Sequence, residues 1–379
     1  GNWSWCEPSH ATSDGSISYT ISETLQNGWR QTGNTVDQTI VLGGASVVLN
    51  STTTPPYTYM VTVPTNANAS ADALNFGNIP QGTVFGAKYY DAPSRTVGIL
   101  DLTGSGPFSA LDALISGWHI SQAGDTSNAL TTGSSGTDPN GYPDNFTETL
   151  DPGTYTFAEV QATNGWVQTG NTTKQGTTTG NAAVTLNSNK TYSVTIPNDQ
   201  PSTVSGLYFG NVCLRGGGGL TLGFWSNKNG QALEIAADFT MLTVLNLRNA
   251  NGSNRDFTDT LAHNKSALNT WLLSASATNM AYMLSAQLAA MELNVAHGFV
   301  SPTALIYAPG TTSADVNGFA TVAAIMAEAN TSLGLSGTTV AASATRSYQE
   351  ALKNALDKAN NNLNFVQSSV STCPAPAFP

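Results

Sequence analysis

Apolar and polar side chains alternate through much of the first half of the chain, and this period of two predicts β-strands with one buried face. Residues 19–24 alternate large side chains with Ser and Thr, and residues 155–159 show the same alternation. Asn-Gly and Asp-Pro-Gly steps, which favour tight turns, separate such runs. Short strands with frequent turns predict β-sandwich modules.

These alternating runs belong to an internal repeat, because the same short sequences recur in the same order. Each copy contains Gly-Trp-x-Gln-Thr-Gly, then an alternating strand that ends in proline, and then Phe-Gly-Asn. The matched segments are 28–33 with 165–170, 59–64 with 192–197, and 76–78 with 209–211. Several identities at nearly constant spacing indicate two related modules.

The second copy is the more complete one. Residues 82–91 and 115–120 are expected to form two further strands that open it, whereas only a short leader, residues 1–18, precedes the first alternating run. We therefore expect an incomplete β-sandwich module with a leader at 1–80 and a complete module at 81–213.

The pattern changes after a glycine-rich segment at 214–219, which predicts a flexible hinge. Beyond it, apolar residues recur at helical spacing, so residues 220–379 are expected to form a mainly α-helical domain. The expected helices are 279–294, 315–333 and 345–362, with less regular periodicity at 235–247 and 264–273. The predicted fold class is multi-domain, with antiparallel β-sandwich modules followed by helices.

Composition favours an extracellular location for this architecture. Charged residues make up only 10% of the chain, and Ser, Thr, Asn and Gly supply the polarity, as suits a surface protein that packs against copies of itself. The formal net charge of -11 and the lack of a Lys/Arg cluster exclude nucleic acid as a predicted partner. No run of about 18 apolar residues is present, so no membrane span is predicted.

Cysteine spacing and glycosylation motifs fit the same location. Cys6, Cys213 and Cys373 lack the spacing of a zinc site, so we expect one disulfide, with no basis for choosing the pair. Nine Asn-x-Ser/Thr motifs are candidate glycosylation sites. They begin at Asn2, Asn50, Asn68, Asn145, Asn171, Asn189, Asn251, Asn264 and Asn330.

Five motifs follow one another in residues 82–212. They are Gly-x-Lys-Tyr-Tyr-Asp (86–91), Gly-Trp-x-Ile (117–120), Pro-Gly-x-Tyr-x-x-x-Glu (152–159), Gly-Trp-x-Gln-Thr-Gly (165–170) and Phe-Gly-Asn (209–211). Together they resemble the B-type domains of bacterial surface adhesins, of the serine-aspartate-repeat and collagen-adhesin B types. The resemblance implies a prealbumin-like antiparallel β-sandwich. The segment 220–230 looks like the start of a domain found in other secreted microbial proteins, whose role is unknown.

The resemblance also implies one covalent site. Some collagen-adhesin B-type domains join a lysine of the first strand to an asparagine of the last through an isopeptide bond, assisted by a buried glutamate. The matching residues are Lys88, Asn211 and Glu159. Burial lowers the pKa of a lysine and raises that of a glutamic acid, so a neutral amine can attack the amide. In the alternative interpretation, Lys88 reaches solvent, Glu159 caps a turn and Asn211 holds a bend.

The serine-aspartate-repeat relatives generally lack this bond and often bind calcium through acidic loops. The loop after Asp91 lacks the alternating acidic residues of such sites, so no cofactor is assigned. Asp91, Asp101 and Asp112 remain as calcium candidates. None of the four histidines has a catalytic motif beside it, and no catalytic residue is predicted.

The incomplete first module suggests the function. Its Glu23 and Asn78 match the glutamate and asparagine of the triad, but no lysine-bearing strand precedes them. A module that lacks a strand exposes an apolar groove and an open edge. A strand of a neighbouring subunit, the leader 1–18, or a segment of a longer protein before Gly1 are the three candidates to fill it.

We therefore predict a non-enzymatic extracellular structural protein, a subunit of a surface filament or matrix that assembles with copies of itself by β-strand addition or edge pairing. The alternative is a monomeric surface adhesin that binds a glycan or a protein. A third hypothesis, a secreted enzyme, requires a polar cleft with a perturbed carboxylate pair in the helical domain.

Overall fold

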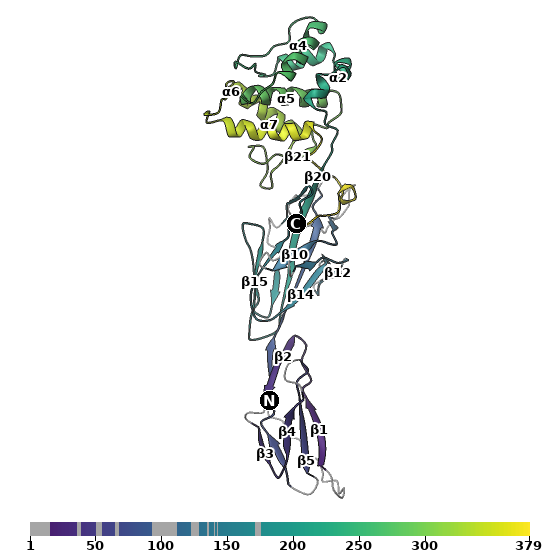
Figure 1. Cartoon of the computed structure of the whole chain (residues 1–379), viewed down its shortest axis with the longest axis vertical. Helices are drawn as coiled ribbons and strands as arrows, with labels where there is room; N and C mark the ends of the chain where they lie inside the picture. Colours follow the sequence, from purple (N-terminus) through teal and green to yellow (C-terminus); the bar gives the residue numbers. More distant parts are fainter. Residues whose placement is uncertain are drawn as a thin grey trace.

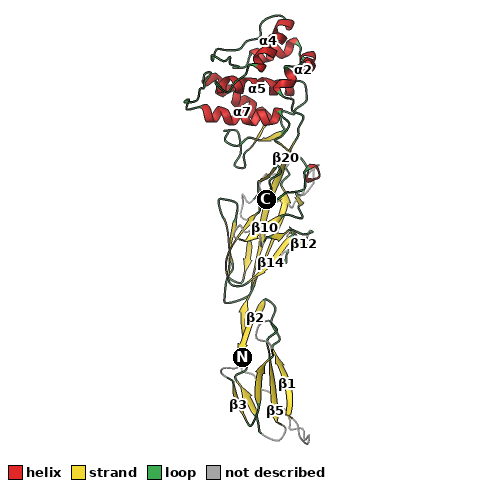
Figure 2. Ribbon diagram, in the orientation of Figure 1, coloured by secondary structure: helices red, strands yellow, loops and turns green. Residues whose placement is uncertain are grey.

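In the computed structural model the chain is an elongated rod, with three parts that follow one another along its long axis (Figure 1). Strands form the N-terminal and middle parts, and helices form the part at the opposite end (Figure 2). The structure describes residues 16–35, 39–50, 55–64, 68–92, 112–122, 129–134, 136–139, 141, 143–170 and 176–379. Within these ranges, no helix has the length and apolar character needed to cross a membrane.

The first part is a small β-module. Its described strands are β1 (Ser16–Ser22), β2 (Trp29–Thr35), β3 (Ile40–Leu42), β4 (Ser46–Leu49), β5 (Thr58–Pro64), β6 (Ser70–Asp72) and β7 (Asn75–Pro80). β1, β5 and β4 form one sheet, while β2 pairs with β7 and β3 with β6. Among the described residues of this module, the buried hydrophobic side chains are Ala45, Tyr59 and Val61. The core of the first module is therefore thin.

The middle part has two large sheets around one core and a separate two-stranded sheet. Its described strands are β8 (Gly82–Tyr90), β9 (Ala113–Leu114), β10 (His119–Gln122), β11 (Leu130–Thr131), β12 (Gly136–Thr137), β13 (Pro143–Asp144), β14 (Phe146–Leu150), β15 (Gly153–Glu159), β16 (Trp166–Gln168), β17 (Thr177–Thr179), β18 (Ala183–Leu186), β19 (Tyr192–Ile196) and β20 (Ser202–Arg215). One sheet has the order β11-β10-β15-β19-β18. The other contains β14, β8 and β20, with β9 beside β8 and with β16 and β17 also paired to β20. Phe157 and Val194 of the first sheet share a core with Val84 and Phe209 of the second.

One strand pair of the middle part departs from the expected antiparallel arrangement. β8 and β20 are parallel, whereas β14 is antiparallel to β8. The reason is their place in the chain: β8 leads away from the first module and β20 leads on toward the helices, so both run in the same direction along the rod (Figure 1).

The first and middle parts are joined by a short and well-bonded junction. Gln81 alone separates β7 from β8. Its backbone N–H donates to the carbonyl of Gly28 at 2.7 Å, and its carbonyl accepts from the backbone N–H of Ser202 at 3.2 Å. Arg30 donates to the two carboxylate oxygens of Asp151 at 2.9 Å and 2.5 Å, and this contact lowers the pKa of Asp151.

The third part is mainly helical, so the prediction of a mixed β and α protein is confirmed. Its described elements are α1 (Leu222–Trp225), α2 (Lys228–Leu233), α3 (Ala236–Thr243), α4 (Leu261–Leu273), α5 (Met280–Ala296), α6 (Val322–Leu335) and α7 (Arg346–Asn360), with short strands β21 (Leu305–Tyr307), β22 (Phe319–Thr321) and β23 (Phe365–Val366). The helix expected at 315–333 begins only after Thr321, because that side chain caps the helix by accepting the N–H of Ala324. The residues just before the cap form β22.

The glycine-rich segment is held in place, in contrast to the flexible hinge expected at 214–219. β20 continues to Arg215 and pairs there with β23 of the helical part. The N–H groups of Gly217 and Gly218 donate to Asn362 Oδ1 at 2.6 Å and 2.8 Å. A Cβ atom at either glycine would clash with neighbouring atoms. Glycine is required here by close approach of the backbone to the helical part.

The end of the chain returns to the middle part, so residues 220–379 are not one separate helical unit (Figure 1). Cys373 forms a disulfide with Cys213 of β20, with the Cα atoms 5.8 Å apart. The ring of Phe378 stacks on His119 with a centroid distance of 4.3 Å and meets Trp118 edge-on at 5.5 Å.

Candidate functional site

Lys88 lies on the core-facing side of β8. Alternate residues of a strand face the same way, so Lys88 shares its side with Val84 and Tyr90, two members of the core of the middle part. The side chain of Lys88 has no exposed area. Burial of an ammonium without partners would cost several kcal/mol, of order 2–7 even for a neutral polar group, so its contacts must be specific.

Three oxygen atoms accept hydrogen bonds from the Lys88 amine. They are Glu159 Oε2 at 2.7 Å, the backbone carbonyl of Phe209 at 3.2 Å, and Asn211 Oδ1. An ammonium has three N–H donors, so this set satisfies it completely. The amine also lies 4.2 Å from the centre of the Trp118 ring, where the π-face attracts a cation.

Glu159 and Asn211 contact each other as well as the lysine. Asn211 of β20 donates through Nδ2 to Glu159 Oε1 at 3.0 Å, while the other carboxylate oxygen accepts from Lys88. Glu159 is the last residue of β15, opposite Ile120 of β10, and its side chain is 3% exposed. The structure thus brings together all three residues that the resemblance indicated. Lys88 does not extend to solvent.

Burial determines the charge properties of the site. It lowers the pKa of Lys88 from its ordinary 10.5 to about 8, and the negative charge of Glu159 opposes this shift. A neutral amine, which is the nucleophilic form, is therefore accessible near neutral pH.

The arrangement brings together the three side chains that an isopeptide bond requires. In that reaction the Lys88 amine attacks Cγ of Asn211, Glu159 takes a proton from the amine and passes it to the leaving group, and ammonia departs. The amide nitrogen of Asn211 already donates to Glu159, so the proton has a direct path. No other reactant is required. The fixed contact of amine and amide supplies the proximity that such a reaction needs.

Trp118 and the carbonyl of Phe209 are parts of this site that the sequence did not reveal. Trp118 is fully buried and donates through Nε1 to the carbonyl of Val160 at 3.1 Å. Its place in the Gly-Trp-x-Ile motif indicates a core residue, but nothing in the motif indicates that its ring will face a lysine.

The structure shows which of the predicted disulfide and glycosylation residues are paired, buried or exposed. Cys213 and Cys373 pair, while Cys6, Asn2 and Asn171 lie outside the described residues. Asn145 and Asn264 are buried and use their side-chain nitrogens in internal hydrogen bonds, so the folded protein cannot carry glycans on them. Asn330 is half-buried, and its Oδ1 accepts from the backbone N–H of Asn246. The exposed motif residues are Asn50, Asn68, Asn189 and Asn251.

The calcium candidates do not form a metal site in the described part of the chain. Asp91 and Asp112 are buried, and Asp112 accepts the backbone N–H of Ala92 at 3.0 Å. Asp101 lies outside the described residues. No group of three or more His, Cys, Asp or Glu residues that could hold a metal ion occurs among the residues described.

The first module contains two of the three site residues in matching positions. Asn78 of β7 donates through Nδ2 to Glu23 Oε1 at 2.5 Å, as Asn211 does to Glu159 in the middle part. The two modules therefore share this side-chain contact as well as the repeated sequence. The position of the lysine has no counterpart among the described residues of this module.

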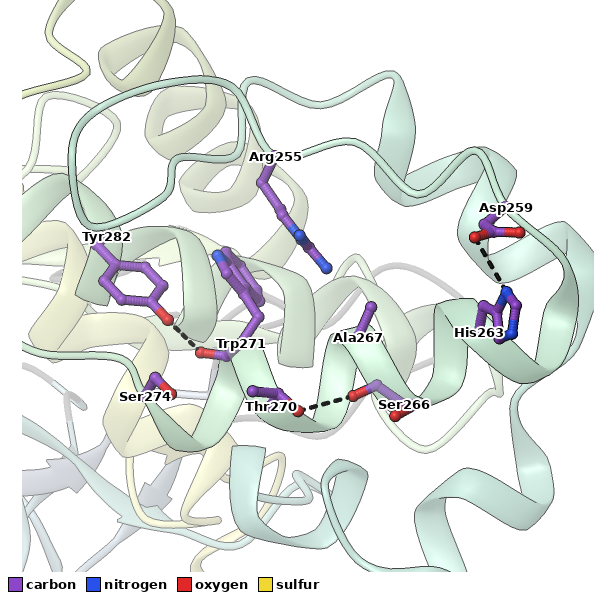
Figure 3. A pocket seen from close by; sticks show the side chains of 9 residues that line it. All are labelled: Arg255, Asp259, His263, Ser266, Ala267, Thr270, Trp271, Ser274 and Tyr282. Carbon is purple, nitrogen blue, oxygen red and sulfur yellow. Dashed lines mark hydrogen bonds and ion pairs between the residues drawn. The ribbon is translucent and has the colours of Figure 1, made fainter.

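A surface hollow of about 570 Å³ lies in the helical part (Figure 3). Asp259 is the only carboxylate among its lining residues, and it contacts His263 at 3.1 Å. The hydroxyl of Tyr282 donates to the carbonyl of Trp271 at 2.5 Å. Burial raises the pKa values of Glu234 and Glu292 to about 7, but neither residue lines this hollow. The carboxylate pair that the enzyme hypothesis requires is not formed there.

Comparisons with protein-family models, curated proteins and solved structures each gave no match. The functional argument therefore depends on the geometry of the chain itself.

Proposed function

We propose that this chain is a non-enzymatic extracellular structural protein, a subunit of a filament or matrix that assembles by β-strand addition between subunits. The contrast between β7 and β20 carries the proposal. β20 pairs with β8 along one edge and with β16 and β17 along the other. The equivalent strand β7 pairs with β2 alone among the strands that the structure describes. An unpaired edge is a template for a further strand.

The apolar surface of the first module supports the same proposal. Val41, Leu42, Val48 and Met60 are 43%, 60%, 51% and 38% exposed, and Val48 lies opposite Met60 on neighbouring strands. No large hydrophobic side chain described between residues 82 and 215 reaches this exposure. Apolar surface that one module exposes and that its relative replaces with polar residues, as Ser193 replaces Met60, indicates a contact with another chain.

Covalent bonds within the middle part, one proposed and one present, also suit a structural role. The proposed isopeptide bond would join its first strand to its last, and the disulfide joins β20 to the end of the chain. An intact mass lower than the sequence mass by one ammonia, beyond the loss from disulfide formation, tests the first bond.

Hydrogen exchange combined with sedimentation tests the assembly. We expect the purified chain to form larger species as its concentration rises. Amides of β7 that exchange rapidly in the monomer should become protected in the assembly, whereas β20, paired on both edges, stays protected throughout and serves as the internal control. A chain that remains monomeric at high concentration, with β7 already protected, would contradict the proposal.

A monomeric adhesin makes a different prediction for the same sample. It would bind a glycan or protein saturably and show no concentration-dependent growth. Negative-stain microscopy of the native material distinguishes the two, because only strand addition produces linear polymers.

A further inference from the structure

Arg255 lines the hollow of the helical part and carries a buried donor without a partner. The guanidinium points toward the face of α4 that carries Ala267 (Figure 3). The Nε–H group of Arg255 is buried, and no described residue accepts a hydrogen bond from it. An unsatisfied buried donor of a charged side chain is unfavourable, so it marks a place where an acceptor from a ligand would bind.

Two other half-buried arginines of the helical part are used by the fold itself. Arg248 donates through Nε and Nη2 to the carbonyl of Leu333 at 3.1 Å and 2.9 Å. Arg346 donates to the carbonyl of Thr339 at 3.3 Å. Among the arginines described in this part, Arg255 alone keeps a buried donor unpaired. Its guanidinium is therefore left for a partner from outside the fold.

Contacts of the backbone and of an aromatic ring hold Arg255 in position. Its backbone N–H donates to the carbonyl of Leu247 at 2.8 Å, and its guanidinium lies 4.6 Å from the centre of the Phe257 ring. Phe257 is buried against Trp271, with ring centroids 6.1 Å apart. A side chain that is already positioned loses little conformational entropy when a ligand binds, which favours a specific site.

The charges around the hollow favour an anion that carries a single charge. Arg255 is the one arginine or lysine among the lining residues, and burial lowers the pKa of its guanidinium. Asp259, the one carboxylate of the lining, is exposed and contacts His263. It would repel a phosphate or sulfate group more strongly than a carboxylate. A carboxylate can accept from Nε–H and one Nη–H of Arg255 in the two-bond geometry that a guanidinium favours.

Hydroxyl groups lie beside this cation. Ser266, Thr270 and Ser274 line the hollow and follow one another at a spacing of four along α4, so they form a row on one face of the helix. The row is about 12 Å long, since the rise is 1.5 Å per residue. All three residues are exposed, and the Thr270 hydroxyl is oriented by its bond to the carbonyl of Ser266 at 3.0 Å. Such a row can donate to and accept from a ligand that is itself rich in hydroxyls.

We propose that the hollow between Arg255 and α4 binds an acidic sugar of the uronic acid class. The sugar carboxylate accepts hydrogen bonds from the Arg255 guanidinium, and the sugar hydroxyls bond to the serine and threonine hydroxyls of α4. A neutral sugar would leave the arginine unpaired, and an acidic peptide would leave most of the hydroxyl row unused. The site lies within one chain, so it goes beyond the proposed function and holds for a monomer as well as for a filament subunit.

The buried Nε–H group is itself a probe of binding. Its NMR signal in the full chain is assigned by its absence from the Arg255→Lys variant. The chain is then titrated at constant ionic strength with glucuronate and galacturonate, with glucose and galactose as the matched neutral sugars, and with acetate and inorganic phosphate. We expect the Arg255 signal to shift saturably with at least one uronate and to stay in place with both neutral sugars. Acetate, which lacks hydroxyls, should bind about tenfold more weakly than that uronate.

Three variants sharpen the test, with ligand-observed NMR as the measure of affinity. Arg255→Met should weaken binding of the uronate about a hundredfold, whereas Lys228→Met removes the same charge outside the hollow and should leave the affinity unchanged. The double variant Ser266→Ala/Ser274→Ala should weaken binding of the uronate about tenfold and leave binding of acetate unchanged. The unfolding temperature of Arg255→Met should not fall, because no described residue accepts from Nε in the free protein.

The remaining outcomes contradict the inference. An Arg255 signal that moves with neither uronate overturns it. Equal affinity for acetate and uronate, or tighter binding of phosphate than of uronate, also overturns it, because the site would then recognise charge without the sugar. A loss of stability in Arg255→Met as large as that in Arg248→Met would assign Arg255 to the fold instead of to a ligand. None of these results bears on strand addition by the first module.

Discussion

The two β-modules of this chain carry the same glutamate–asparagine contact in two different situations. In the middle module, Lys88 completes the contact, both sheets share one core, and the last strand is paired on both edges. In the first module, Glu23 and Asn78 face no described lysine and the last strand has one described partner. The comparison shows that the lysine and the second strand partner of the middle module have no counterpart among the described residues of the first.

The largest effect is expected from removing the lysine of the middle module, which leaves its glutamate and asparagine without an amine beside them. Lys88→Met should abolish the loss of one ammonia from the intact mass. The bond would join positions 123 residues apart. A covalent link that closes a loop of this size restricts the unfolded chain by about 4–5 kcal/mol, so the free energy of unfolding should fall by at least that amount. Mass spectrometry and calorimetry of the same sample measure both quantities.

Lys228→Met is the matched control, because Lys228 is exposed on α2. It should change neither the ammonia loss nor the unfolding transition. A Lys88→Met protein as stable as the wild type would show that no covalent bond forms between Lys88 and Asn211.

The next effect concerns the disulfide that joins the middle module to the end of the chain. Cys373→Ser removes the disulfide to Cys213 and should lower the free energy of unfolding by about 2–5 kcal/mol. The segment around Phe378 should then become accessible to proteases. Wild-type protein in reductant should behave like the variant, and a difference between the two would mean that the serine itself perturbs the site.

A smaller effect, a change of stability with pH, is expected from the buried lysine of the middle module. Glu159→Gln should prevent the isopeptide bond and leave Lys88 buried without its counter-charge, so its pKa stays below the ordinary 10.5, at about 8 or lower. The unfolded chain then binds more protons than the folded one between these two values. Stability should therefore rise by about 3 kcal/mol as the pH increases through this window.

Chemical denaturation at several pH values measures that slope. The double variant Lys88→Met/Glu159→Gln corrects for other titrating groups and should lack the added rise. Wild-type protein with the bond formed should also lack it, because an amide nitrogen does not titrate in this range.

The smallest effect is expected where the two modules meet. Arg30 and Asp151 are each 41% exposed, so Arg30→Ala should change the free energy of unfolding by about 0–1 kcal/mol. Its effect should instead appear in small-angle scattering as a wider distribution of rod lengths. An unchanged distribution would indicate that the other contacts of the junction, such as the hydrogen bonds of Gln81, are enough to hold the two modules in line.

The sequence predicted much of the β structure and of the candidate site because both depend on local patterns. Alternation places Lys88 and Glu159 on strands, and the repeated Phe-Gly-Asn identifies Asn211. The repeat also identifies Glu23 and Asn78. These features need no knowledge of distant contacts.

The remaining features arise from residues far apart in the chain. Cys213 and Cys373 are separated by 160 positions, and no local pattern favours that pair over one with Cys6. The glycine-rich segment was interpreted as a hinge because glycine is typical of both flexible and tightly packed backbone. Its contact with Asn362 decides between the two. The prealbumin-like topology of the middle module stays a prediction.

The parallel pairing of β8 and β20 has a mechanical consequence. Tension applied along the rod enters the middle module at Gly82 and leaves it through Arg215, at opposite ends of two neighbouring parallel strands. The hydrogen bonds between them are then loaded together in shear and do not open one after another. With Lys88 and Asn211 joined, the load would pass directly from one strand to the other, and the residues between those positions could not be drawn out. The middle module would then be nearly inextensible.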